Sequence, residues 1–286
     1  MRLSSLSVAG VETIGLHKDD GVYDLRIASP DLPQRLDHLM MSDDGLQRAT
    51  RAADRITNDC RMRDASVAYL PLLRNPGKII CVGRNYAAHA REGGVEPLAY
   101  PDLFLRCSTS LIGHECAMVR PRCSDKLDYE GELAFVIGRK ARHVRAADAH
   151  DYVLGYSLFN EGTIRDYQRK SSQWTIGKNF DGTGAFGPFL VTSDELPSGA
   201  AGLELTTRLN GMEMQSGNTD DLIFPVDKLI EILTECMTLE PGDVVVTGTP
   251  SGVGYARTPP VFLKPGDVVE VDIEGMGTLR NHVADD

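Results

Sequence analysis

The chain has 286 residues, of which 42% are hydrophobic, so it can bury a substantial core in one large domain or two. Its 30 basic and 41 acidic side chains give a net charge of −11, which argues against nucleic acid or an anionic membrane as the main partner. No apolar run approaches the length of a membrane span, and the N-terminus lacks the apolar core of a signal peptide. The 6 cysteines include no CxxC pair and are typical of reduced thiols, so we expect a cytoplasmic protein.

Residues 1–70 are predicted to form a small α+β domain without a reactive group of side chains. A turn-rich stretch at 71–77 marks its boundary with a larger domain over 71–286. Turn residues and hydrophobic periodicity predict the elements of the small domain, which are strands at 8–16 and 21–27 followed by helices at 36–41 and 46–56.

An acidic segment, DYEGE at 128–132, leads into the apolar run LAFVI at 133–137, which predicts a buried strand. Extending that strand backwards places Asp128, Glu130 and Glu132 on one face, with the two glutamates roughly 7 Å apart. Carboxylates held in this way lose hydration and repel each other, so one must take a proton or both must share a cation. A hard divalent ion suits oxygen ligands. A solvated edge strand with outward acids is the alternative interpretation.

A third carboxylate follows the next predicted strand. Residues 153–159 form an apolar run that ends at Asn160 and Glu161, where a side chain can complete a three-ligand oxygen site. Further along, Lys178 lies between glycine and aromatic neighbours in the segment TIGKNF at 175–180. The acids therefore predict a metal centre.

A candidate general base follows the short apolar strand predicted at 78–83. The alanine-containing segment 84–94 favours a helix of about two turns that stops at a pair of glycines. His89 and Glu92 are then i,i+3 neighbours on one face of this helix. A carboxylate beside an imidazole raises its basicity, which suits a base that acts on water, although a surface ion pair has the same spacing.

Strands dominate the C-terminal part of the chain. Residues 182–187 match GxGxxG, but Pro188 follows and no helix is expected to begin there, so a nicotinamide cofactor is not supported. The glycine-rich loop 247–254 lacks the GK[ST] of a phosphate-binding loop. The remaining signals predict an Asn-Gly hairpin at 210–211, an amphipathic helix at 225–237, and Pro-Gly turns at 241–242 and 265–266 that each begin a strand.

Four ordered motifs give the chain a resemblance to a known family. They are KIICVGRNYAAH at 78–89, DYEGELA at 128–134, GK at 177–178 and TGTPSGVG at 247–254. Over residues 71–282 the chain resembles the fumarylacetoacetate hydrolase superfamily, in a short bacterial-type form similar to acylpyruvases and 2-hydroxyhepta-2,4-diene-1,7-dioate isomerases. This resemblance implies an α+β protein, with a mixed β-sandwich or β-roll catalytic domain and a homodimeric assembly.

The resemblance also implies roles for particular residues. Glu130, Glu132 and Glu161 would hold Mg²⁺, or else Mn²⁺ or Ca²⁺. His89 and Glu92 would activate water on a mobile lid helix, and Lys178 would face the developing enolate or oxyanion. The side chains implied to contact the substrate carboxylate or its neighbours are Arg84, Tyr86, Gln168 and Thr249.

The activity implied is a metal-dependent C–C bond hydrolysis of a small 1,3-diketo acid through a metal-chelated enolate. Isomerisation or decarboxylation of a related 2-oxo acid is the first alternative. The second is a catalytically silent binding protein, because the family most often has Asp where this chain has Glu161. The extra methylene shifts the carboxylate, and Mg²⁺ tolerates poor octahedral geometry badly.

Overall fold

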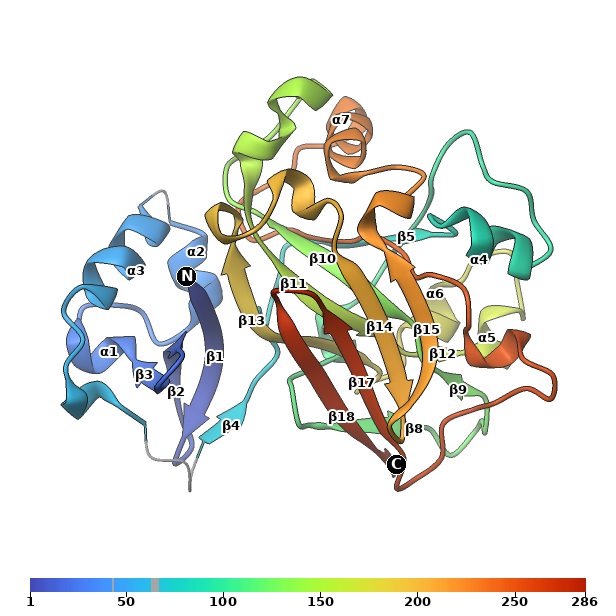
Figure 1. Ribbon diagram of the computed structural model, residues 1–286, viewed down its shortest axis with the longest axis horizontal. Helices are drawn as coiled ribbons and strands as arrows, with labels where there is room; N and C mark the ends of the chain where they lie inside the picture. The colour runs from blue at the N-terminus through green and yellow to red at the C-terminus, as the bar shows by residue number, and fades with distance from the viewer. Residues whose placement is uncertain (43, 63–66) are drawn as a thin grey trace.

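The computed structural model describes residues 1–42, 44–62 and 67–286, and shows an α+β protein built on a large mixed sheet and a smaller second sheet (Figure 1). The large sheet contains, from edge to edge, β3 (Gly21–Asp24), β2 (Val11–Lys18), β1 (Arg2–Val8), β13 (Gly184–Thr192), β11 (Val153–Glu161), β10 (Gly131–Ile137), β16 (Val244–Val246), β5 (Ile79–Gly83) and β6 (Asp102–Leu105), with β4 (Val67–Tyr69) beside β1 and β7 (Leu111–Ile112) beside β13.

The second sheet contains β15 (Met212–Asn218), β14 (Glu204–Leu209), β17 (Val268–Ile273), β18 (Gly277–Asp285) and β8 (Ala117–Arg120). A two-stranded ladder joins β9 (Leu127–Asp128) to β12 (Thr163–Ile164). The α-helices are α1 (Leu25–Ala28), α2 (Leu36–Met40), α3 (Gly45–Ala53), α4 (Ala87–Glu92), α5 (Arg165–Gln168), α6 (Thr175–Lys178) and α7 (Val226–Cys236). No helix within the described residues is long and apolar enough to cross a membrane.

The N-terminal elements follow the predicted order with two differences. A turn at Ala9 and Gly10, both with positive φ, separates β1 from β2, so the strand predicted at 8–16 begins only at Val11, and the Ser-rich strand β1 before it was missed. Residues 25–28 form α1 instead of continuing the strand predicted at 21–27, because the Asp24 carboxylate accepts the amide of Arg26 and caps a helical turn. The β2–β3 hairpin and the two later helices are confirmed.

The N-terminal elements share a sheet and a core with the rest of the chain. Strand β1 pairs antiparallel with β13, with Leu3 opposite Leu190. Leu36 and Leu39 of α2 belong to the same buried cluster as Val136 of β10. The division into domains at residue 70 stays a prediction, while the sheet itself runs across it.

Strand β10 contributes buried side chains to two core clusters, which confirms the buried strand predicted at 133–137. Leu133 and Phe135 lie in the cluster between the large sheet and the second sheet, together with Leu205 of β14. Ala134 and Val136 point the other way, into the cluster that includes the N-terminal helices. Side chains alternate along a strand, so one apolar run supplies both sides of the sheet.

The acidic segment that precedes β10 differs from the prediction. One continuous strand through 128–137 was wrong, because Asp128 ends β9, which pairs with β12, and Gly131 begins β10. Tyr129 and Glu130 lie between the two strands. The chain changes its pairing partner here. Asp128 lies in the ladder of β9 with β12, whereas Glu132 lies in β10, which pairs with β11.

Three C-terminal predictions are confirmed. Asn210 and Gly211 both adopt positive φ, as a type I′ turn requires, and join β14 to β15. Helix α7 buries Leu229 and Leu233. Residues 184–192 form β13 and not a helix, so the glycine-rich segment does not start the helix that a dinucleotide-binding loop would need.

Candidate active site

The predicted site residues meet in a cavity on the side of the molecule that carries α4, α5 and α6, away from the N-terminal helices (Figure 1). Its volume is about 140 Å³, close to that of an engineered cavity that holds benzene. Eight of the ten predicted residues line it, namely Arg84, His89, Glu130, Glu132, Glu161, Gln168, Lys178 and Thr249. Such a volume suits a small metabolite.

Three buried carboxylates converge at the base of the cavity. Strand pairing sets Gly131 opposite Asn160, and the amide of Glu161 donates to the carbonyl of Glu130 at 2.8 Å. One carboxylate oxygen from each of Glu130, Glu132 and Glu161 lies within 4.8 Å of the others. Pairing between β10 and β11 therefore brings together acids that are far apart in the sequence.

The chemistry of this triad fits a divalent cation. The Oε1 atom of Glu161 is buried and has no hydrogen-bond partner among the described residues. Burial, and then the charges of Glu161 and Glu130, raise the pKa of Glu132 well above its usual range. Carboxylate oxygens of this kind are the ligands that Mg²⁺, Mn²⁺ and Ca²⁺ take. The Glu161 carboxylate thus lies beside those of Glu130 and Glu132, even though its side chain is one methylene longer than that of Asp.

Lys178 supplies a cation directly beside the triad. Its ammonium group contacts Glu130 and lies 2.7 Å from Oε2 of Glu161. Burial disfavours the charged amine, but the two carboxylates outweigh it and raise the pKa of Lys178. Gly177 lets α6 approach α5, because a Cβ there would collide with the backbone of Gln168.

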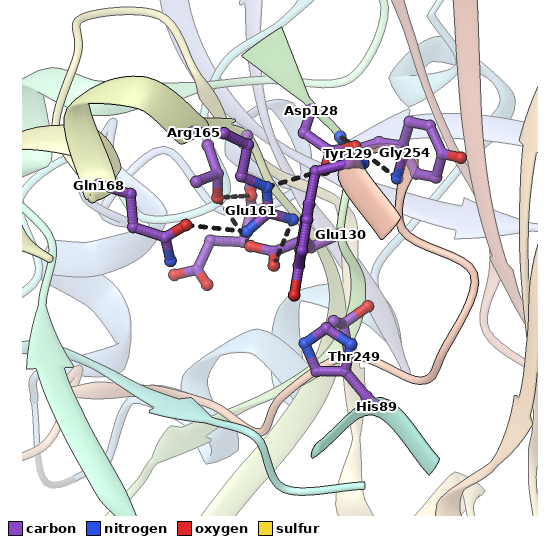
Figure 2. A network of polar contacts seen from close by, with 12 residues as sticks. His89, Asp128, Tyr129, Glu130, Glu161, Arg165, Gln168, Thr249 and Gly254 are labelled. Carbon is purple, nitrogen blue, oxygen red and sulfur yellow. Dashed lines mark hydrogen bonds and ion pairs between the residues drawn. The ribbon is translucent and has the colours of Figure 1, made fainter. Parts of the chain in front are cut away.

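Arg165 binds Glu130 of the triad, and Asp128 holds Arg165 in place. The Arg165 guanidinium donates to Oδ2 of Asp128 and to Oε1 of Glu130, both at 2.8 Å, and to Oε1 of Gln168 at 3.1 Å (Figure 2). Although burial favours the neutral acid, Arg165 and Lys178 hold the pKa of Glu130 well below its usual range. Neither Arg165 nor Asp128 was assigned a role from the sequence. The only signal was the position of Asp128 within the acidic motif.

The glycine-rich loop 247–254 binds the acids of the site through its backbone. Gly248 and Gly252 have φ of 102° and 105°, which side chains rarely allow. Three of its N–H groups donate to three carboxylates, Gly248 to Glu132 at 2.6 Å, Gly252 to Glu92 at 2.8 Å and Gly254 to Asp128 at 2.8 Å. The motif thus orients side chains of the site through its backbone amides.

His89 and Glu92 form the predicted pair on α4. Nδ1 of His89 lies 3.0 Å from Oε2 of Glu92, whose other oxygen accepts the Gly252 amide. Because a carboxylate is an acceptor, it favours the tautomer with the proton on Nδ1 and leaves Nε2 as a base. His89 lines the cavity, and Figure 2 shows it across from the carboxylates of Glu130 and Glu161. Glu92 contacts His89 and does not line the cavity.

The four predicted substrate contacts are placed differently from one another. Arg84 and Gln168 line the cavity, and Nε of Arg84 donates to Asp102 at 2.7 Å. Thr249 also lines it, but its hydroxyl donates to the Gly131 carbonyl at 2.8 Å.

Tyr86 is buried and lines a separate hollow with Arg91 and Asp221. Its hydroxyl has no hydrogen-bond partner within the described part of the chain. Its role as a substrate contact stays a prediction. The charged and aromatic lining residues that the sequence reasoning missed are Arg165, Arg169, Trp174 and Tyr255.

Comparison with known proteins agrees with this architecture. Residues 78–284 match the family described as Fumarylacetoacetate (FAA) hydrolase C-terminal. The chain is 40% identical over 275 residues to the mitochondrial oxaloacetate tautomerase fahd2 of Xenopus laevis, covering 94% of this chain and 85% of that protein.

Two solved structures extend the comparison over the whole chain. A fumarylacetoacetate hydrolase of Exiguobacterium antarcticum has a TM-score of 0.87 at 33% identity, covering 100% of both chains. A maleylpyruvate hydrolase of Sphingobium sp. SYK-6, solved with manganese(II) and pyruvate, has a TM-score of 0.81 at 27% identity. The match covers 100% of this chain and 99% of that one. The chain therefore belongs to the fumarylacetoacetate hydrolase family.

Proposed function

We propose that this chain is a divalent-metal-dependent enzyme of small 1,3-diketo acids, and that it hydrolyses the C–C bond of an acylpyruvate-like substrate. The observation that carries the proposal is the cavity itself, in which three buried carboxylates face a histidine that has its own carboxylate partner. Glu130, Glu132 and Glu161 would hold the ion. When bound, it polarises the carbonyl oxygens of a chelating substrate.

The residues of the chain supply the proton transfers. His89 takes a proton from water at Nε2 as the water oxygen adds to the acyl carbonyl, and Glu92 stabilises the imidazolium. The C–C bond then breaks, and its electron pair moves into the enolate of pyruvate. The ammonium of Lys178 lies beside the triad, where it stabilises the negative oxygen. Return of the proton to the enolate carbon gives pyruvate and a carboxylic acid, with one water consumed.

A second candidate is keto–enol tautomerisation of oxaloacetate or a related 2-oxo dicarboxylate. The observation that favours it is the 40% identity to a protein named as an oxaloacetate tautomerase, over 94% of this chain. His89 would move a proton between oxygen and carbon with no water consumed. The same acids and Lys178 would stabilise the enolate, so the two reactions share a site and differ in products.

The test is product analysis by ¹H NMR with Mn²⁺- or Mg²⁺-loaded protein. Acetylpyruvate should yield acetate and pyruvate, whereas the enol of oxaloacetate should yield only its keto form. Fragments from acetylpyruvate support hydrolysis, and acceleration of ketonisation alone supports the second candidate. No turnover of either, with metal bound, would leave the catalytically silent binding protein.

We also propose that the protein forms a homodimer through the edge of the large sheet. Strand β6 is that edge, and it exposes Leu103 and Leu105, while Ile176 of α6 is 61% exposed. An unpaired edge strand with apolar side chains is commonly covered in folded proteins. Light scattering should report a dimer for the wild-type protein and a monomer for Leu105→Lys. A wild-type monomer at micromolar concentration would rule this out.

A further inference from the structure

The cationic side chains that line the cavity differ in their partners. Arg84 pairs with Asp102, Arg165 with Asp128 and Glu130, and Lys178 with Glu130 and Glu161. Arg169 also lines the cavity. Within the described residues it contacts no carboxylate, and its guanidinium donates no hydrogen bond. Of these four cationic side chains, Arg169 is the one without a carboxylate partner in the part of the chain that the structure describes.

Arg169 is nevertheless held in place. It follows Arg165 by four residues, and its amide donates to the Arg165 carbonyl at 3.3 Å. Both guanidinium groups lie over the ring of Tyr255, with the Arg165 carbon 4.4 Å and the Arg169 carbon 4.5 Å from the ring centroid. Contact of this kind between a cation and an aromatic face is attractive.

Tyr255 is itself anchored to the site. Its amide donates to Oδ2 of Asp128 at 3.0 Å, the same oxygen that accepts Nε of Arg165. The ring lines the cavity. One buried carboxylate thus positions both Arg165, which contacts Glu130, and the ring that the exposed side chain of Arg169 contacts.

We propose that Arg169 binds a second carboxylate of the substrate, which makes the cavity selective for 2-oxo acids that carry carboxylates at both ends. This inference rests on the proposed function, in which the 2-oxo acid end lies at the triad and Lys178. A guanidinium presents paired N–H donors that match a carboxylate. Because Asp102 already compensates Arg84, Arg169 is the group with donors available for the distal end.

The experiment measures binding to Mn²⁺-loaded protein by calorimetry with three probes. Oxalate reports the metal and oxo-acid end, 2-oxopentanoate adds an uncharged tail, and 2-oxoglutarate adds a tail of the same length that ends in a carboxylate. The variants are Arg169→Gln, which removes the charge, and Arg169→Lys, which keeps the charge without the paired donors. Lys170→Gln is the matched control, since it removes one positive charge at the next residue, outside the cavity lining.

We expect wild-type protein to bind 2-oxoglutarate about tenfold more tightly than 2-oxopentanoate, as one charged hydrogen-bonded pair allows. Arg169→Gln should remove this preference and leave oxalate affinity unchanged, and Arg169→Lys should restore part of it. Lys170→Gln should keep it. The inference would be overturned if Arg169→Gln and Lys170→Gln lost this preference equally, or if Arg169→Gln weakened the binding of all three probes equally. It would also be overturned if wild-type protein showed no preference. Absence of oxalate binding to wild-type protein would instead refute the proposed function on which it rests.

Discussion

Glutamine substitutions at Glu130 and Glu132 should have different effects on the stability of the metal-free protein, although both acids belong to the same triad. Glu130 contacts two buried cations, Arg165 and Lys178. Glu132 forms no ion pair within the described residues and accepts only the Gly248 amide at 2.6 Å. The first carboxylate compensates charge, whereas the second adds negative charge next to two other acids.

The expected magnitudes follow from these contacts. Removing one partner of a buried ion pair costs about 3–5 kcal/mol. Asp128 still holds Arg165, and Glu161 still holds Lys178, so Glu130→Gln should lower the free energy of unfolding by about 3 kcal/mol, at the low end of that range. Glu132→Gln keeps an oxygen for the Gly248 amide and removes repulsion, so its effect should lie within about 1 kcal/mol of zero or be stabilising.

The assay is urea unfolding at pH 7 in the presence of a chelator, with the free energy taken from the midpoint and slope. A parallel titration with Mn²⁺ should show both variants binding at least about tenfold more weakly, or about 1.4 kcal/mol. Each glutamine thus serves as the control for the other, because size and position are nearly matched and only the surrounding charge differs.

Equal destabilisation by the two substitutions, or a larger loss for Glu132→Gln, would refute the assignment of charge in the triad. An unchanged Mn²⁺ isotherm for either variant would remove that residue from the metal-binding set. A changed slope of unfolding would indicate an altered denatured or native state, so the comparison is made on variants with wild-type slopes.

His89→Ala should lower turnover at least about 100-fold, since a positioned base is lost, while Mn²⁺ affinity stays unchanged; parallel loss of both would contradict the division of roles. Asp128→Asn should weaken Mn²⁺ binding and lower kcat, because Arg165 loses its anchor and no longer braces Glu130; a change in thermal stability alone would show that Asp128 is merely structural. Burial, with the charges of His114 and Arg2, lowers the pKa of His17 to about 4. The unfolded chain therefore binds a proton first as the pH falls below the ordinary value of about 6.5, so stability should drop between pH 6.5 and 4 by at most about 3 kcal/mol. His17→Gln should flatten this part of the stability curve, with exposed His38→Gln as control, and superimposable wild-type and His17→Gln curves would count against it.

Local patterns in the sequence predicted the elements whose signals lie within a few residues. The apolar run of β10, the Asn-Gly hairpin, the buried face of α7 and the spacing of His89 and Glu92 all depend on periodicity or on turn chemistry, which neighbouring residues determine. The family motifs added a predicted ligand set with predicted roles, because they associate distant residues that periodicity cannot relate. The sequence alone therefore predicted the acids, the base and the lysine as a group, and the structure brings the three acids, His89 and Lys178 to one cavity.

Tertiary structure decided how these groups interact. The change of strand partner between Asp128 and Gly131, the pairing of β1 with β13, and the position of Tyr86 outside the cavity depend on long-range contacts. The Asp128–Arg165–Glu130 contacts join segments more than 30 residues apart, and their charges matter because packing removes water from them. Arg169 looks like any polar surface residue in the sequence. Only the folded chain places it on the cavity wall, over Tyr255 and without a carboxylate partner among the described residues.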